Sequence, residues 1–291
     1  MSQITNNFIR RHNGPREEEI AEMLKIIGVD SLKTLIDQTV PTGIRLPKPL
    51  NLPEALNEHE YLDHLRLLGS KNKLFKSYIG MGYYPSITPG VIQRNILENP
   101  GWYTSYTPYQ AEISQGRLEA LLLFQTMVSE LTALPVANAS LLDEGTAAAE
   151  AMIMFFNSRS RQAVKDGATK FFVAETTFQQ TKDVMRTRAV PLGIELVYGD
   201  WRNFEFDPSF FGALIQYPDD LGEIHDYREF TEHAHASGAM VCAAADLMSL
   251  ALMIPPGEWG ADVVVGSNQR FGLPMGYGEL HAELFCNERR V

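Results

Sequence analysis

The sequence contains little cysteine, no long apolar run and no apolar signal core at its start. Its two cysteines, Cys242 and Cys286, lack metal-ligand spacing and indicate a reducing compartment rather than a disulfide framework. No stretch of about 18 apolar residues is present, so we expect no membrane span and no membrane partner. Residues 1–15 lack the apolar core of a secretory signal. We therefore expect a cytoplasmic protein, or a protein of the mitochondrial matrix if the source is eukaryotic.

Basic residues are also in the minority. The chain has 25 lysines and arginines against 36 aspartates and glutamates, a net charge of -11. Nucleic-acid binding depends on basic patches that release counterions, so we expect no nucleic-acid partner. Hydrophobic residues make up 45% of the 291 positions and charged residues 21%, and this balance is typical of a globular protein with a substantial core.

Residues 111–291 alternate short apolar strands with helical segments. Strands are predicted at residues 135–137, 170–174, 194–198, 212–217, 240–244, 262–265 and 281–286. Helices are predicted at residues 113–134, 145–159, 178–187 and 226–237. Such alternation predicts an α/β fold, with a mainly parallel sheet covered by helices on both faces.

Residues 1–110 predict a helical arm followed by aromatic loops. Helices are expected at residues 15–27, 31–38, 54–68 and 90–97. Four prolines favour an extended chain over residues 41–53. We therefore divide the chain into an arm with aromatic loops, residues 1–110, and an incomplete α/β large domain, residues 111–291.

Two strand ends indicate one site. The strand at residues 240–244 is followed by Asp246, and the strand at residues 262–265 by Ser267-Asn268-Gln269-Arg270. Ligands of open α/β sheets bind outside the carboxyl ends of such strands. In pyridoxal-phosphate enzymes of the aminotransferase-like class, an aspartate at one strand end pairs with the pyridine nitrogen and a lysine at a later one forms the Schiff base. No lysine follows Lys182 here, and arginine cannot replace it because its guanidinium stays protonated.

Several polar residues have simpler structural interpretations. Asp143-Glu144-Gly145 opens a helix that could cradle a phosphate, but its two acids favour a plain capped helix. His233 and His235 lie two apart on a helix and so on different faces, which favours two surface histidines over a zinc site. Without a Schiff-base lysine, Asp246 is interpreted as a turn residue. We expect no metal site.

The longer motifs together are similar to one family. Arg11-His12-Asn13-Gly14-Pro15 lies near the start, YIGMGYYP covers residues 78–85, and NPGWYTSYTPYQAEISQ covers residues 99–115. Further similar stretches are residues 138–150, 187–200 and 260–278. Over nearly all its length, the chain resembles the amino-terminal half of the glycine cleavage system P-protein, the decarboxylating glycine dehydrogenase.

The resemblance implies a fold and a reaction. The fold would be the large domain of the aminotransferase-like class (fold type I), preceded by the helical arm. The reaction would be the pyridoxal-phosphate-dependent decarboxylation of glycine, with transfer of the aminomethyl group to the lipoyl arm of the H-protein. The Schiff-base lysine and most of the cofactor would belong to the carboxyl-terminal half, fused or as a second subunit. The implied partners are therefore that half, the lipoylated H-protein and glycine.

The resemblance also implies what this half contributes. It would have no catalytic residue of its own, with Gln269 and Arg270 at the degenerate lysine position. The residues expected to line the glycine and lipoyl-arm pocket at the interface are Tyr83, Tyr84, Tyr106, Thr107, Tyr109 and Gln110. Members of the family continue past the position of Val291, so we expect the carboxyl-terminal small domain to be missing and this chain alone to be inactive.

Two hypotheses about function follow. In the first, the chain is an enzyme component that completes the P-protein site once the lysine-bearing half is present. In the second, it is a non-catalytic structural or binding homologue that keeps the fold without the reaction. The lack of lysine after Lys182 is common to both, whereas the aromatic loops favour the first.

Overall fold

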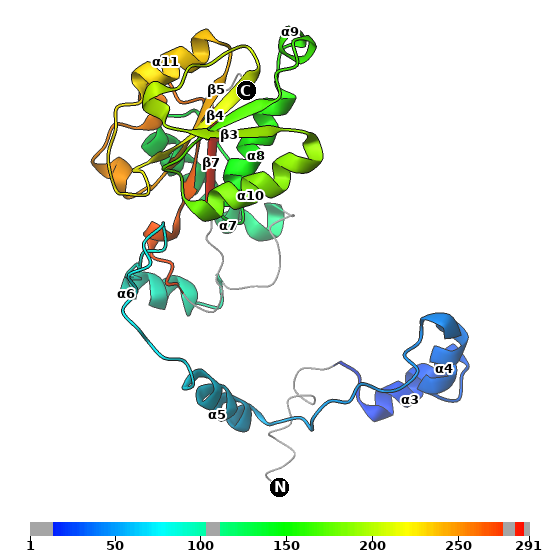
Figure 1. The fold of residues 1–291 in the computed structure, drawn as a ribbon. Helices are drawn as coiled ribbons and strands as arrows, with labels where there is room; N and C mark the ends of the chain where they lie inside the picture. The colour runs from blue at the N-terminus through cyan, green and yellow to red at the C-terminus, as the bar shows by residue number, and fades with distance from the viewer. Residues whose placement is uncertain (1–13, 103–110, 276–282, 288–291) are drawn as a thin grey trace. The chain divides into compact units, whose positions relative to one another are not determined.

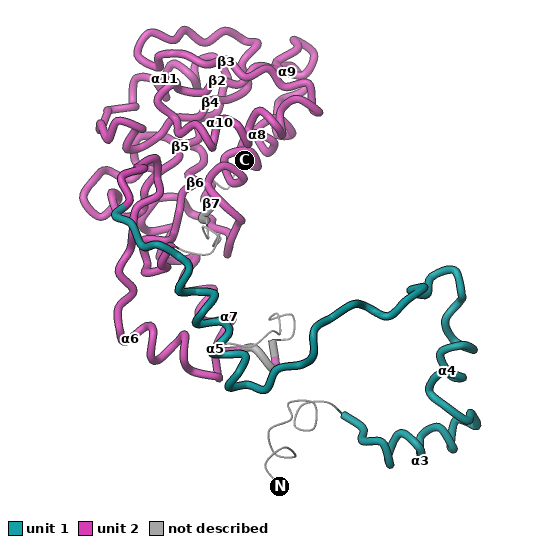
Figure 2. The backbone as a smooth tube through the Cα atoms, turned by 60° about the horizontal axis from the view of Figure 1, so that its bottom comes forward, with its two compact units in different colours: residues 1–76 teal, residues 77–291 magenta. Residues whose placement is uncertain are grey.

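The computed structural model describes residues 14–102, 111–275 and 283–287 (Figure 1). The chain divides into two compact units, residues 1–76 and 77–291, which are coloured separately in Figure 2. We call them the arm unit and the large unit. The sequence-based domain division at residue 110 stays a prediction. No helix in the described ranges is long and apolar enough to span a membrane.

The arm unit contains the three helices expected there. They are α3 (Glu17–Ile27), α4 (Leu32–Thr39) and α5 (Glu58–Gly69), and none of their residues is buried. Asn57 caps α5 and accepts a hydrogen bond from the backbone N–H of Glu60 at 3.0 Å, which is why this helix begins later than residue 54. A 3-10 turn at Thr42–Ile44 interrupts the segment predicted to be extended. The predicted helical arm is therefore confirmed, with that one correction.

The described part of the large unit contains a seven-stranded sheet with the order β1-β7-β6-β5-β4-β2-β3. The strands are β1 (Val136–Ala137), β2 (Lys170–Ala174), β3 (Glu195–Gly199), β4 (Phe210–Tyr217), β5 (Met240–Ala245), β6 (Val263–Ser267) and β7 (Glu283–Asn287). Pairing is parallel from β3 through β6, and β7 is antiparallel to both β6 and β1. The prediction of a mainly parallel sheet is confirmed.

Helices cover both faces of this sheet (Figure 1). One core forms under α8 (Glu144–Asn157) and α10 (Gln179–Ala189), and a second under α7 (Ala111–Thr132) and α11 (Arg228–Ala236). Along β2, Phe171 belongs to the first core and Phe172 to the second, because successive side chains of a strand point to opposite faces. Burial on both faces explains why the strands are continuous apolar runs.

The predicted strands and helices of residues 111–291 all lie within about two residues of the observed ones. The sequence missed α9 (Arg161–Lys165), whose five residues are too few to set up a helical period. The predicted helix at residues 90–97 is present as α6 (Gly90–Ile92) followed by a π-helical turn, Gln93–Leu97. The aromatic segment from residue 77 to residue 102 lies in the large unit.

Candidate functional site

The ends of β5 and β6 lie together at the carboxyl edge of the sheet, as the sequence predicts. These two strands are parallel neighbours, so the residues that follow them share that edge. Arg270 Nε donates to Asp246 Oδ1 at 3.1 Å, and Arg270 Nη2 donates to Asp246 Oδ2 at 2.7 Å. Arg270 therefore lies where the Schiff-base lysine of the fold class would be expected, and its guanidinium binds Asp246 through two hydrogen bonds.

Asp246 has two roles, and sequence analysis predicted only one of them. Its Oδ1 also accepts the backbone N–H of Met248 at 3.0 Å, and Ser249 Oγ donates to its backbone carbonyl at 2.6 Å. The turn interpretation is therefore confirmed. The ion pair with Arg270 was missed, although an aspartate and an arginine at the ends of adjacent parallel strands were a sufficient signal.

Gln269, the other residue at the degenerate position, is buried. Several further side chains near the carboxyl ends of the strands carry a buried polar atom without a hydrogen-bond partner. They are Thr176, Thr177, Gln180, Gln216 and Asn268. Beside Asn268 lies a pocket of about 450 Å³. Its walls include Trp102, Arg117 and Phe124. Since buried polar groups are normally paired, this edge provides hydrogen-bonding capacity that the described chain does not satisfy itself.

The start of α8 confirms the interpretation as a capped helix. Asp143 Oδ1 accepts the backbone N–H of Thr146 at 2.6 Å, and Glu144 is the first helical residue. A phosphate at this helix start would therefore meet the Asp143 carboxylate, which opposes its binding by charge and already accepts the N–H of Thr146.

The pKa of the Glu144 carboxyl is raised, and burial is the main cause. It raises the pKa of this carboxyl to about 7, although hydrogen bonds from Thr181 and Gln216 oppose the change. The bond from Thr181 Oγ1 measures 3.2 Å. The negative charges of Asp246 and Asp143 raise the pKa further. Near pH 7 the carboxyl is therefore close to half protonated.

The raised pKa of Glu144 predicts how Glu144→Gln changes the stability of the fold. The folded state keeps the proton up to about pH 7, whereas the unfolded carboxyl loses it near its ordinary pKa of 4.5, so wild-type stability falls between those values. We expect the variant to be more stable than wild type above pH 7, by about 2 kcal/mol, and to lack this decline. Urea unfolding of both proteins at pH 5 and pH 8 measures the difference.

Glu195→Gln is the matched control, because Glu195 is an exposed glutamate on β3. It should leave the pH dependence of the free energy of unfolding as in wild type. If Glu144→Gln gained no stability over wild type on going from pH 5 to pH 8, the raised pKa would be disproved.

The tyrosines predicted to line a pocket are only partly within the described ranges. Tyr83 and Tyr84 lie at the rim of the large unit, each with 38% of its surface exposed. The Arg270 guanidinium carbon lies 4.7 Å from the centre of the Tyr84 ring. The remaining predicted residues lie outside the described ranges: they are Tyr106, Thr107, Tyr109 and Gln110.

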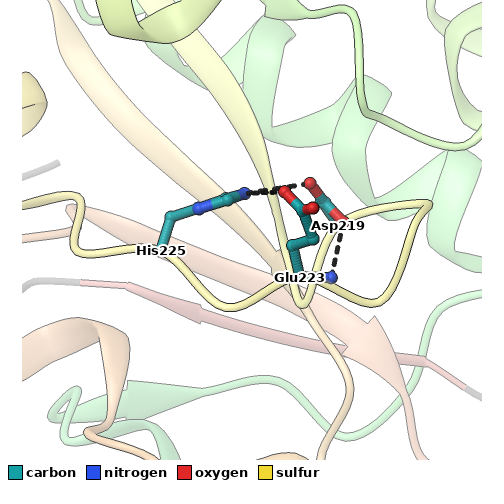
Figure 3. A group of neighbouring side chains, drawn as sticks. All are labelled: Asp219, Glu223 and His225. Atoms are coloured by element: carbon teal, nitrogen blue, oxygen red, sulfur yellow. Dashed lines mark hydrogen bonds and ion pairs between the residues drawn. The ribbon is translucent and has the colours of Figure 1, made fainter.

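A second polar cluster lies in the loop after β4 (Figure 3). His225 Nε2 lies 3.0 Å from Asp219 Oδ2 and 3.4 Å from Glu223 Oε2, a spacing close enough to hold a cation. However, Arg202 Nη2 lies 3.7 Å from the Glu223 carboxylate and 3.4 Å from His225 Nε2. Because a positive group already borders these atoms, we assign the cluster as an ion-pair network. His233 and His235 are both exposed, as predicted.

The sheet and its edge define the class of protein. A mainly parallel sheet with the order above, one reversed strand and the Asp246 strand end is the large domain of the pyridoxal-phosphate-dependent transferases of fold type I. A crystal structure described as glycine decarboxylase (P-protein) of the glycine cleavage system, in inhibitor-bound form, is similar with a TM-score of 0.84. The match has 34% identity and covers 96% of this chain and 63% of that chain.

Sequence comparison then identifies the family. The model of the family described as glycine cleavage system P-protein matches residues 10–291. The glycine dehydrogenases (decarboxylating) of Flavobacterium johnsoniae and of a Nostoc species are both 56% identical over 98% of this chain. The chain belongs to the glycine cleavage system P-protein family, as its motifs predicted. It spans about 30% of the length of these relatives.

The residues at the edge of this sheet do not fit pyridoxal phosphate. Lys182, the last lysine of the chain, donates to the carbonyl of Glu175 at 2.9 Å and lies on α10 rather than after β6. Asp246, at the strand end where the fold class has an aspartate that pairs with the pyridine nitrogen, is paired with Arg270. At the helix start, where a cofactor phosphate would need free N–H groups, the Asp143 carboxylate accepts the N–H of Thr146 instead.

Proposed function

We propose that this chain is the amino-terminal part of a glycine dehydrogenase (decarboxylating) and forms one wall of an active site whose lysine comes from the carboxyl-terminal half. The observation that carries the proposal is the family match over residues 10–291. The Arg270–Asp246 pair supports the division of labour, because it leaves neither an amine nor a free carboxylate for the cofactor on this chain.

In the proposed reaction, glycine loses carbon dioxide and its aminomethyl group passes to the lipoyl arm of the H-protein. Pyridoxal phosphate, held by the lysine-bearing half, supplies the electron sink. This chain contributes orienting groups at the interface, with Tyr83 and Tyr84 among them. Tyrosine hydroxyls suit this task because they can orient a small zwitterion by hydrogen bonds without adding charge.

The proposed partners are the lysine-bearing half, glycine and the lipoylated H-protein. Whether the lysine-bearing half is fused to this chain or separate does not alter the proposed site. A cytoplasmic location is part of the proposal. It is supported by the bacterial sources of the relatives and by the buried free thiols of Cys242 and Cys286.

Exchange of labelled bicarbonate into the carboxyl group of glycine tests the proposal. We expect no exchange with this chain alone, and at least about tenfold more exchange with this chain plus the lysine-bearing half than with that half alone. Tyr83→Phe should lower kcat/KM of the combined enzyme by about tenfold, more than any loss of folded protein explains, because it removes one orienting hydroxyl.

Two outcomes would contradict the proposal. Exchange no greater than with the lysine-bearing half alone would favour the non-catalytic homologue. A Tyr83→Phe variant whose activity falls only in proportion to its folded fraction would remove Tyr83 from the site, because the hydroxyl would then matter for folding alone.

A further inference from the structure

The Arg270 side chain presents a fixed, planar cation at the edge of the sheet. Both of its bonds to Asp246 run in the plane of the guanidinium, and only 17% of the Arg270 side chain and 29% of the Asp246 side chain are exposed. In this geometry the carboxylate binds at the edge of the guanidinium plane, and the flat face of the guanidinium stays free for another contact. The Tyr84 ring lies against the guanidinium, with its centre 4.7 Å from the central carbon, a cation–π contact.

Tyr84 belongs to a segment that has little regular structure of its own. We call residues 80–89 the tyrosine loop. Three successive residues, Gly80, Met81 and Gly82, have positive φ values of 64°, 56° and 86°. For Met81 this conformation is unfavourable and has to be stabilised by surrounding contacts. The tyrosine loop therefore depends on anchors outside itself.

The anchors lie on both sides of the strand ends. Gln180 Nε2 on α10 donates to the carbonyl of Met81 at 2.7 Å. At the other end, Ser86 Oγ donates to the carbonyl of Leu273, and Thr88 Oγ1 to that of Gly272. Tyr84 lies between these two attachments and is the point at which the loop contacts the ion pair.

We propose that the Asp246–Arg270 pair, at the place where other members of the fold class hold their cofactor, serves here as an anchor for the tyrosine loop. Arg270 is a positioning residue: Asp246 fixes its guanidinium, and the guanidinium fixes the Tyr84 ring and, through the backbone, Tyr83. Its effect on activity rests on the function proposed above, whereas its effect on the loop does not.

Arg270→Met tests the anchor, because methionine keeps an unbranched apolar side chain and removes the guanidinium. Hydrogen exchange of the loop amides, measured on this chain combined with its lysine-bearing half, should accelerate by about tenfold, the loss expected for one cation–π contact. Tyr84→Leu should give the same acceleration, and Tyr84→Phe, which retains a ring, should not. Arg228→Met is the matched control, since Arg228 forms an exposed pair with Asp226.

Activity gives a second readout that simple loss of stability would not reproduce. In glycine–bicarbonate exchange, Arg270→Met and Tyr84→Leu should each lower kcat/KM by about tenfold. If they act through one contact, the double variant should also lose about tenfold rather than a hundredfold.

The outcomes separate this proposal from the proposed function. If the loop amides of Arg270→Met exchange hydrogen at the wild-type rate, the anchor proposal is overturned, whatever the activity. An additive, hundredfold loss in the double variant would also overturn it, because the two side chains would then act independently. If the wild-type chain combined with its lysine-bearing half shows no glycine–bicarbonate exchange, the proposed function fails. Hydrogen exchange of the loop amides still decides for or against the anchor.

Discussion

Gly266→Ala is expected to destabilise the large unit by about 4 kcal/mol or more, the largest effect of any single substitution considered. Gly266 lies on β6, one of the central strands. A Cβ at this position would lie 2.0 Å from the carbonyl oxygen of Ala245 on the neighbouring strand β5. Backbone atoms in the middle of a sheet cannot move aside without breaking the hydrogen bonds between strands. Relieving this clash would therefore disrupt the pairing of β5 with β6.

Gly116→Ala is the control for this prediction. Gly116 lies within α7, and beyond its own helix backbone a Cβ there would meet no atom of the described residues within 4 Å. Alanine should therefore stabilise the chain by about 0.5–1 kcal/mol through its better helix propensity. Urea unfolding monitored by circular dichroism measures both variants. A Gly266→Ala protein within about 1 kcal/mol of wild type would show that β5 and β6 do not approach as described.

Asp219→Ala is expected to cost about 3 kcal/mol, because it removes the acceptor for three surrounding groups. The Asp219 side chain is fully buried. Its Oδ1 accepts the backbone N–H groups of Leu221 at 3.0 Å and Glu223 at 2.8 Å. Its Oδ2 lies 3.0 Å from His225 Nε2. Alanine would leave these groups without their carboxylate and would loosen the loop that follows β4.

The neighbouring Asp220 provides a matched control. It is exposed, so Asp220→Ala should change the free energy of unfolding by no more than about 0.5 kcal/mol. Thermal unfolding of the two variants side by side gives the comparison. Equal and small effects would mean that the Asp219 carboxylate does not organise the loop. Stabilisation of the wild type but not of Asp219→Ala by zinc, or loss of wild-type stability on chelation, would contradict the assignment of this cluster as an ion-pair network.

The regular part of the large unit could be predicted because its strands are buried on both faces. Runs such as residues 240–244 contain almost no polar side chain, and capping residues such as Asp143 mark the helix starts between them. The short α9 and the 3-10 turn at Thr42–Ile44 could not be predicted in this way, because neither is long enough to carry a period.

The site was only partly predictable, for a different reason. The rule that ligands bind at the carboxyl ends of parallel strands placed Asp246 and Arg270 at one edge of the sheet. The lack of a lysine there showed that this edge cannot form a Schiff base. The contact between Arg270 and Tyr84 joins residues 186 positions apart in the sequence. Nothing in the local pattern of the tyrosine loop indicates which part of the sheet it meets. The raised pKa of Glu144 likewise depends on burial by elements that come later in the chain.

The division between the two halves is tested most directly by where the cofactor is attached. Combine this chain with its lysine-bearing half, add pyridoxal phosphate, reduce with borohydride, and locate the pyridoxyl group by peptide mass spectrometry. We predict one equivalent on a lysine of the other half and none on this chain, whose last lysine, Lys182, lies on α10. A stoichiometric pyridoxyl group on any lysine of this chain would contradict the claim that its own edge cannot hold the cofactor.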